Sequence, residues 1–161
     1  MTIVEAAAAD VETVRRLFRA YAAALPFSLA YQDFDRELAG LPAPYVPPGG
    51  ALLARRGGAA LGIVGVKPLA PAVAEVKRLY VEPAARGLGL GRRLLDRALA
   101  AAAALGYERV RLDSHRPSMA AAIALYRQFG FTEIAPYGPN PDGQFAFFEM
   151  RLLLRWQSSR E

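Results

Sequence analysis

The sequence predicts one domain of the mixed α/β (or α+β) class, in which about four helices cover a sheet of about six to seven strands. Strand-like and helix-like segments alternate in the order β-α-α-β-β-β-α-β-α-β-β, a pattern unlike that of a helical bundle or a β-sandwich. The length of 161 residues suffices to bury one core, and no internal repeat divides the chain. We therefore expect a single domain over residues 1–154 and a polar tail over residues 155–161.

The N-terminal third is expected to form a strand, two helices and a loop. Residues 2–6 lean toward β structure and give the first strand. Asp10 fits a helix N-cap, and apolar residues recur behind it at three- and four-residue spacing, which predicts a helix to about Ala24. A shorter helix is predicted over residues 33–39. The proline- and glycine-rich residues 41–50 predict a loop.

A hairpin and a further strand are expected next. Gly57-Gly58 is a two-residue hairpin signal between strands at residues 51–56 and 59–67. A turn from Pro68 to Pro71 precedes another strand at residues 74–81.

The C-terminal half alternates helices with strands. Leucines and alanines line one face of a helix that begins after Gly89 and ends at Gly106. Residues 110–113 form a short strand, and Ser118 is expected to cap a helix that ends at Gly130. The last two strands are expected at residues 131–135 and 145–153.

Composition excludes several kinds of site. The chain has no cysteine and a single histidine, His115, so it has no disulfide, no thiolate nucleophile and no multi-histidine metal site. We expect no metal. No run approaches the roughly 18 apolar residues of a membrane span, and no signal peptide is visible, which predicts a cytoplasmic protein without a membrane partner.

The net charge of +5 is concentrated in one third of the chain. Residues 86–116 hold seven arginines and three acidic residues. This balance suits an anionic ligand and also suits nucleic acid, while arginine that serves only solubility would leave the same pattern.

The stretch from Glu75 to Arg93 organises the chain. It predicts a strand, a turn that contains Gly87, Gly89 and Gly91, and the start of a helix. Unpaired backbone N–H groups at the positive end of a helix dipole bind anions, and glycine lets a phosphate approach them closely. Arg86 and Arg92 add positive charge at the rim of this turn.

Two well-known phosphate loops do not fit this turn. The dinucleotide pattern G-x-G-x-x-G fails because Arg92 and Leu94 occupy its third glycine position in the two possible registers, and no Gly-Lys-Ser/Thr triplet is present. A phosphate site of another type, or glycines that serve only a tight turn, therefore remain as interpretations.

The hexapeptide Arg86-Gly87-Leu88-Gly89-Leu90-Gly91 matches the Arg/Gln-x-x-Gly-x-Gly/Ala signature of the GNAT superfamily of acetyl-CoA-dependent N-acetyltransferases. Further on, AIALYRQFGF resembles the later helix-and-turn motif of that superfamily, and the order of elements is similar to the GNAT fold from about Ile3 to Leu154. The segments YQDFDRELAGLP, EVKRLYVEP and GFTEIAPYGPNP resemble one bacterial subgroup of small GNAT proteins.

The resemblance implies the following roles. Acetyl-CoA is the expected cofactor, its pyrophosphate held by the backbone of Arg86, Gly87, Leu88, Gly89, Leu90, Gly91 and Arg92, with contacts from Leu79, Tyr80 and Val81. Glu75 would act as the general base and Tyr126 as the general acid. A base is useful because deprotonation of an alkylamine at pH 7 costs roughly 4 to 5 kcal/mol. An ordinary strand carboxylate and a buried tyrosine are the alternative interpretations of these two residues.

The strand that starts at Glu75 is expected to contain a bulge near Arg78-Leu79, because strict alternation leaves neither of its faces cleanly apolar. The chain departs from many GNAT proteins at Met119, where they carry an asparagine, which puts one polar contact near the cofactor in doubt. His115 lies near the predicted cleft and is the next candidate for the base if Glu75 is inert.

These expectations describe an N-acetyltransferase that moves the acetyl group of acetyl-CoA to a primary amine of a small molecule or peptide, by direct attack in a ternary complex. A catalytically idle acyl-CoA sensor and, less favoured, a nucleic-acid-binding protein are the alternatives. A homodimer is compatible with the sequence. Candidate acceptor-site residues are Tyr31, Phe34, Tyr45, His115, Tyr137 and Asn140.

Overall fold

The computed structural model describes residues 1–45 and 51–152. The end of the predicted loop, the last residue of the final predicted strand and the predicted tail at residues 155–161 lie outside the described residues. The strands are β1 (Thr2–Glu5), β2 (Leu52–Arg56), β3 (Ala59–Ala70), β4 (Val73–Val81), β5 (Arg109–His115), β6 (Thr132–Ile134) and β7 (Phe145–Arg151). The α-helices are α1 (Val11–Ala23), α2 (Phe34–Gly40), α3 (Leu90–Ala104) and α4 (Ala120–Phe129).

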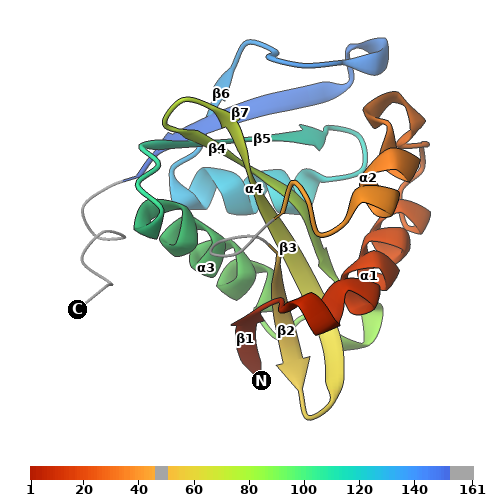
Figure 1. Ribbon diagram of the computed structural model, residues 1–161. Helices are drawn as coiled ribbons and strands as arrows, with labels where there is room; N and C mark the ends of the chain where they lie inside the picture. Colours follow the sequence, from red (N-terminus) through yellow and green to blue (C-terminus); the bar gives the residue numbers. More distant parts are fainter. Residues whose placement is uncertain (46–50, 153–161) are drawn as a thin grey trace.

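All seven strands form one sheet in the order β1-β2-β3-β4-β5-β7-β6. The described strands pair antiparallel with their neighbours except β4 and β5, which run parallel. Helices α1 and α2 cover one face of the sheet, and α3 and α4 cover the other (Figure 1). The predicted fold class and the predicted order of elements are therefore confirmed.

The helices form where the apolar spacing predicts them. Val14, Leu17 and Phe18 of α1 are buried, and the buried side of α3 is a stripe of Leu94, Leu95, Ala98, Leu99 and Ala102. Apolar residues at three- and four-residue spacing share one face of a helix, so each helix buries one face against the sheet. Below α3 lies the larger of two apolar clusters, and below α1 and α2 lies the smaller one.

Two local predictions are wrong. Strand β3 continues through Pro68 to Ala70, and the turn comes at Pro71 and Ala72. Beyond Val64 the strand has β4 as its described neighbour on one side only, and proline is tolerated at such an edge.

The start of α4 also differs from the prediction. Met119 occupies the N-cap position, and the hydroxyl of Ser118 lies 2.7 Å from the Nδ1 atom of His115 instead of capping the helix. The end of the helix is as predicted, because Gly130 adopts the left-handed conformation that glycine tolerates, with φ of 107°.

No described helix combines the length and the apolarity that crossing a membrane requires.

Candidate active site

The central opening of the molecule lies between β4 and β5. These strands pair in parallel only at Val73–Arg109, Ala74–Val110 and Glu75–Arg111, and the described residues beyond these pairs are not joined. On the other side of β4, the pairing with β3 shifts register between Ile63 and Gly65, opposite Arg78 and Leu79. Arg78 has φ of 61°, so the predicted bulge is confirmed. The two strands separate in this region and leave space within the sheet.

A cavity of about 120 Å³ occupies this space. Val76 and Leu79 of β4 and Ala122 and Tyr126 of α4 line it from the side of α3 and α4. Tyr21 of α1 lines it from the opposite side. The cavity therefore reaches from one face of the sheet to the other. Two strands that were hydrogen-bonded along their whole length would close this passage.

Tyr126 is 7% exposed and contributes its side chain to the wall of this cavity. Its ring packs on Phe131 and Phe148, and its hydroxyl has no hydrogen bond to any described residue. Burial raises the pKa of Tyr126 well above its usual value. The phenol is therefore protonated at neutral pH and can donate a hydrogen bond or a proton to a molecule in the cavity.

Met119, where many GNAT proteins carry asparagine, also lines the cavity. The hydroxyl of Ser114 donates to its sulfur over 3.1 Å, and the backbone N–H of His115 lies 3.3 Å from the same atom. The thioether is thus held in place, and it presents an apolar surface where an amide would offer a polar contact.

The loop between β4 and α3 fits an anionic group. Gly87 and Gly89 have φ of 81° and 75°, and a Cβ atom added at Gly87, Gly89 or Gly91 would meet no atom within 4 Å. Gly89 is the N-cap of α3, and no side chain caps the helix. The first amides of this 15-residue helix therefore have no side-chain cap among the described residues, and the glycines leave open space beside them at the positive end of the helix dipole, which suits an anion.

The arginines beside this loop are exposed. Arg86 donates from Nε to the carbonyl oxygen of Val81 over 3.0 Å, and Arg92 stacks on Phe129 and bonds to Gln128. In contrast, Arg109 and Arg111 pair with Glu149, and Arg116 pairs with Glu133. The arginine-rich third is therefore partly neutralised within the protein, which weakens the case for a nucleic-acid surface.

Glu75 is 3% exposed and fully engaged. Tyr137 donates a hydrogen bond to its Oε2 atom over 2.7 Å, and its Oε1 atom lies 3.5 Å from Nζ of Lys67 and 3.7 Å from Nζ of Lys77. Glu75 is not among the residues that line the central cavity. Its carboxylate connects β3, β4 and the loop that leads to β7.

Sequence reasoning missed Asp113 and Lys77, which both line the cavity. Burial raises the pKa of Asp113 and lowers the pKa of Lys77, so the surroundings disfavour the charge of each. Nζ of Lys77 lies 3.4 Å from Oε1 of Gln32, whereas the carboxylate of Asp113 has no hydrogen bond or ion pair with the described residues. The alternation of β5 could have indicated Asp113, because it shares a face with Arg109 and Arg111.

Arg78, at the bulge, was also missed. It is 4% exposed, and its guanidinium bonds both oxygens of Glu37 at 3.0 and 3.1 Å. The rings of Tyr21 and Phe34 lie within 5.7 and 5.2 Å of the guanidinium carbon. This ion pair fixes α2 to the strand that carries the site.

The predicted acceptor residues lie in different environments. Tyr31 packs on Phe145, and burial with the nearby Asp113 raises its pKa to about 12. Both ring nitrogens of His115 are engaged, with Ser118 and with Gln144, which leaves no free nitrogen to act as a base.

The remaining candidates have structural contacts. Asn140 accepts a hydrogen bond from the N–H of Phe145 over 2.9 Å. Phe34 and Tyr45 are buried at 8% and 2% exposure, and neither lines the central cavity. Tyr45 lies against Gly65, where an added Cβ would come within 2.6 Å of its ring.

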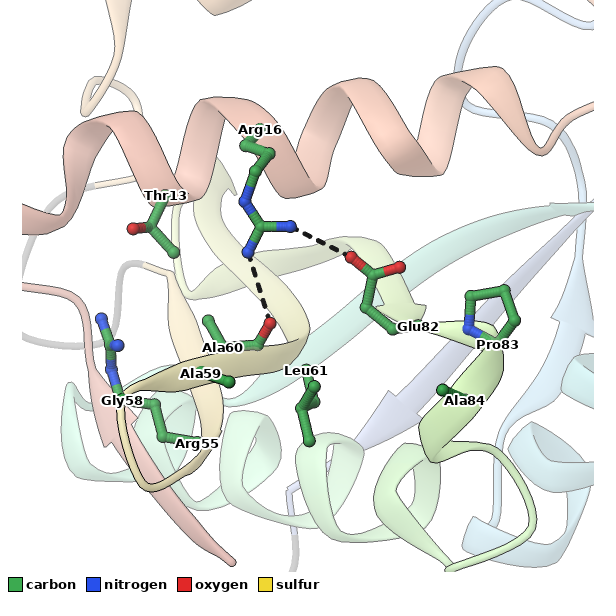
Figure 2. A pocket seen from close by; sticks show the side chains of 10 residues that line it. All are labelled: Thr13, Arg16, Arg55, Gly58, Ala59, Ala60, Leu61, Glu82, Pro83 and Ala84. Atoms are coloured by element: carbon green, nitrogen blue, oxygen red, sulfur yellow. Dashed lines mark hydrogen bonds and ion pairs between the residues drawn. The ribbon is translucent and has the colours of Figure 1, made fainter.

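A second, more open groove of about 550 Å³ lies between α1 and the β2–β3 hairpin. Figure 2 shows that the guanidinium of Arg16 points toward Glu82 and the carbonyl of Ala60, at 3.1 and 3.4 Å. The second arginine of this groove, Arg55, is 2.7 Å from Asp10. Both cations are therefore paired within the protein, and among the described residues this groove offers a ligand no unpaired cation.

Known proteins resemble the chain throughout its length. The profile of the Acetyltransferase (GNAT) family matches residues 12–131. An uncharacterized N-acetyltransferase of Schizosaccharomyces pombe is 35% identical over 146 residues, which cover 89% of each chain. A GNAT-family acetyltransferase from Staphylococcus aureus shares the fold with a TM-score of 0.75 at 19% identity, covering 94% of this chain and 99% of that one. PaiA N-acetyltransferase from Thermoplasma acidophilum, solved in complex with coenzyme A, has a TM-score of 0.66 at 22% identity, covering 93% of this chain and 98% of that one. With the opening between β4 and β5 and the glycine-rich loop before α3, these matches show that the chain belongs to the GNAT family of acyl-CoA-dependent acetyltransferases.

Proposed function

We propose that this enzyme transfers the acetyl group of acetyl-CoA to a primary amine of a small molecule or peptide, which attacks directly in a ternary complex. The observation that carries the proposal is the combination of free amides at the start of α3 with a cavity beside Tyr126, joined by the end of β4. Leu79 lines that cavity, and the glycine loop follows the end of the same strand.

The residues present fit acetyl-CoA. The amides from Gly87 to Arg92 would hold the pyrophosphate, because the glycines leave open space there. The amide of Arg86, which the sequence also suggested, already donates to the carbonyl oxygen of Pro83 over 3.3 Å. The backbones of Leu79, Tyr80 and Val81 would hold the pantetheine in the opening beyond the last β4–β5 pair. The coenzyme A complex of the PaiA acetyltransferase, which shares this fold, supports the assignment.

When bound, acetyl-CoA supplies the thioester carbonyl that the amine attacks, and its C–S bond breaks as the C–N bond forms. We assign to Tyr126 the donation of its hydroxyl proton to the departing sulfur. Its raised pKa keeps that proton in place until it is needed. A positioned acid of this kind is typically worth about 10²- to 10⁴-fold in rate.

As the amide forms, the nitrogen gives up one N–H proton, which would restore the hydroxyl of Tyr126. An acceptor that binds as an ammonium must lose another proton before it can attack. The resemblance implies Glu75 as the acceptor of this proton, and the structure offers a second carboxylate that interacts with Lys77, that of Asp113. Glu75 and Asp113 alternate along their strands with buried residues of the cluster below α3, so both project from the opposite face, which α1 and α2 cover. We assign the acceptor to this face of the sheet. A base on this face and an acid at Tyr126 would then act from opposite sides of the sheet.

Release of coenzyme A across a panel of primary amines tests the proposed function. A thiol reagent detects the product without background, because the chain has no cysteine. We expect amine-dependent release, together with a rise of the melting temperature on addition of acetyl-CoA. Thermal stabilisation without release on any amine would support an idle acyl-CoA sensor instead, and salt-sensitive binding of DNA or RNA without thermal stabilisation would support a nucleic-acid binder.

A further inference from the structure

Chemically different groups line the central cavity from the two faces of the sheet. Tyr126 of α4 presents a protonated phenol from the side of α3 and α4. Asp113 of β5 presents a carboxylate from the other side, because it alternates with the buried Val110 and Leu112. Among the described residues, Asp113 is the one acidic side chain that lines the cavity. Glu75 is on the same face of the sheet but bonds to Tyr137 and two lysines.

We propose that Asp113, and not Glu75, is the catalytic base that receives the acceptor amine, and that Glu75 is a positioning residue for Lys77 and Tyr137. This assignment rests on the proposed acetyl transfer. In the step assigned to Asp113, an N–H bond of the acceptor ammonium breaks, its electron pair stays on nitrogen, and the proton moves to a carboxylate oxygen of Asp113. The neutral nitrogen is then able to attack.

The surroundings of Asp113 suit this step. It interacts electrostatically with Lys77, Glu75, Arg78 and Lys67, which lie on β4 and β3. From the other elements, the hydroxyls of Tyr21, Tyr31, Tyr126 and Tyr137 interact electrostatically with it. Burial dominates over the attraction of Lys77 and raises the pKa of Asp113, which makes its carboxylate a stronger proton acceptor.

Glu75 is suited to another role. A carboxylate that accepts a hydrogen bond from Tyr137 and contacts two ammonium groups has little capacity left for an amine proton. Its partners come from β3, β4 and the loop before β7, so it ties this loop to the two strands. Tyr137 also packs edge-on against Phe147, which ties the same loop to β7.

Comparison of Asp113→Asn with Glu75→Gln tests the proposal. The measurement is kcat/KM from pH 5 to pH 10, with an alkylamine that the wild type acetylates. We expect Asp113→Asn to lower kcat/KM about 10²- to 10⁴-fold near pH 7 and to lose less as the pH approaches the pKa of the amine, about 10.4, where the nitrogen needs no base. Glu75→Gln should lower kcat/KM by a factor that does not vary with pH.

The dissociation constant of acetyl-CoA gives a second readout. It should change less than about twofold in Asp113→Asn, because this residue lies on the acceptor side of the cavity. Asp35→Asn, on the exposed surface of α2, is the matched control and should keep wild-type kcat/KM at every pH.

Three results would overturn the assignment. The first is a kcat/KM of Asp113→Asn that stays within about threefold of wild type. The second is a loss of kcat/KM in Asp113→Asn by the same factor at every pH, as a structural defect would cause. The third is a pH-dependent loss of kcat/KM in Glu75→Gln. If the wild type binds acetyl-CoA and acetylates no amine, the proposed function fails, and the assignment of Asp113 fails with it. If the wild type acetylates an amine and Asp113→Asn remains active, the assignment of Asp113 as the base fails while the proposed function stands.

Discussion

The hydroxyl of Tyr137 donates a 2.7 Å hydrogen bond to the carboxylate of Glu75, which lies 62 residues earlier in the chain. This bond joins the loop before β7 to the middle of the sheet. Tyr137→Phe removes the donor and leaves a buried carboxylate oxygen without it. We expect the free energy of unfolding to fall by about 1–2 kcal/mol in urea denaturation.

Tyr107→Phe is the control for this change, because Tyr107 is half-buried and its hydroxyl has no hydrogen bond to a described residue. It should leave the free energy of unfolding within about 0.5 kcal/mol of wild type. Equal effects of the two substitutions would show that the bond to Glu75 contributes nothing to stability.

Arg78 and Glu37 form a buried ion pair at the bulge of β4. Arg78→Met should lower the free energy of unfolding by about 3–5 kcal/mol, because it leaves the carboxylate of Glu37 without its cation. The matched control is Arg36→Met, which breaks an exposed pair with Asp33 and should cost less than about 1 kcal/mol. Thermal denaturation of both variants checks this, and similar melting temperatures would contradict it.

Substitution of Gly91 tests whether the loop before α3 binds the pyrophosphate, separately from the stability of the fold. Gly91→Ala places a methyl group in open space inside the first turn of α3, where alanine is the better helix former by up to about 1 kcal/mol. We expect stability to stay the same or rise while the affinity for acetyl-CoA falls at least tenfold, because the methyl group occupies the approach of the pyrophosphate.

Gly40→Ala at the end of α2 is the control for Gly91→Ala, since it also has open space for a methyl group. It should leave the acetyl-CoA affinity unchanged. Calorimetric titration with acetyl-CoA measures the affinity of both variants. An unaltered affinity in Gly91→Ala would mean that the pyrophosphate binds elsewhere.

Tyr126→Phe removes a hydroxyl that has no hydrogen bond to a described residue. The melting temperature should therefore change little, whereas kcat should fall about 10²-fold or more if this hydroxyl protonates the departing sulfur. Steady-state kinetics at saturating acetyl-CoA provides the measurement. A kcat within about twofold of wild type would remove Tyr126 from the proposed chemistry.

The stability of Asp113→Asn should depend on pH. Because the pKa of Asp113 in the folded protein is raised above the usual 3.8, the folded state binds this proton more tightly than the unfolded state. Above the raised pKa, the buried carboxylate of Asp113 is charged and lowers the free energy of unfolding. This loss of stability disappears as the pH falls below 3.8, where the carboxyl is protonated in both the folded and the unfolded state. We expect Asp113→Asn to unfold at a higher temperature than wild type at pH 7 and to lose this advantage below pH 4. An advantage that is equal at both pH values would argue against the buried charge.

The sequence by itself determined which elements form and where the glycine-rich loop before α3 lies. Apolar spacing marks α1 and α3, and Gly89 and Gly130 mark a helix start and a helix end, because these signals depend on neighbours within one or two turns. The absence of clean alternation in β4 likewise predicted its bulge.

Only the tertiary structure decided what surrounds each side chain of the site. Glu75 meets Tyr137, Arg78 meets Glu37, and Asp113 faces the cavity from a different strand than either. Burial and charge pairing arise from residues that are far apart in the chain, so local patterns cannot show which carboxylate is engaged and which is free. The sequence therefore indicated the glycine-rich loop and Tyr126 as candidates, and the packing of the sheet showed that Glu75 is engaged while Asp113 lines the cavity.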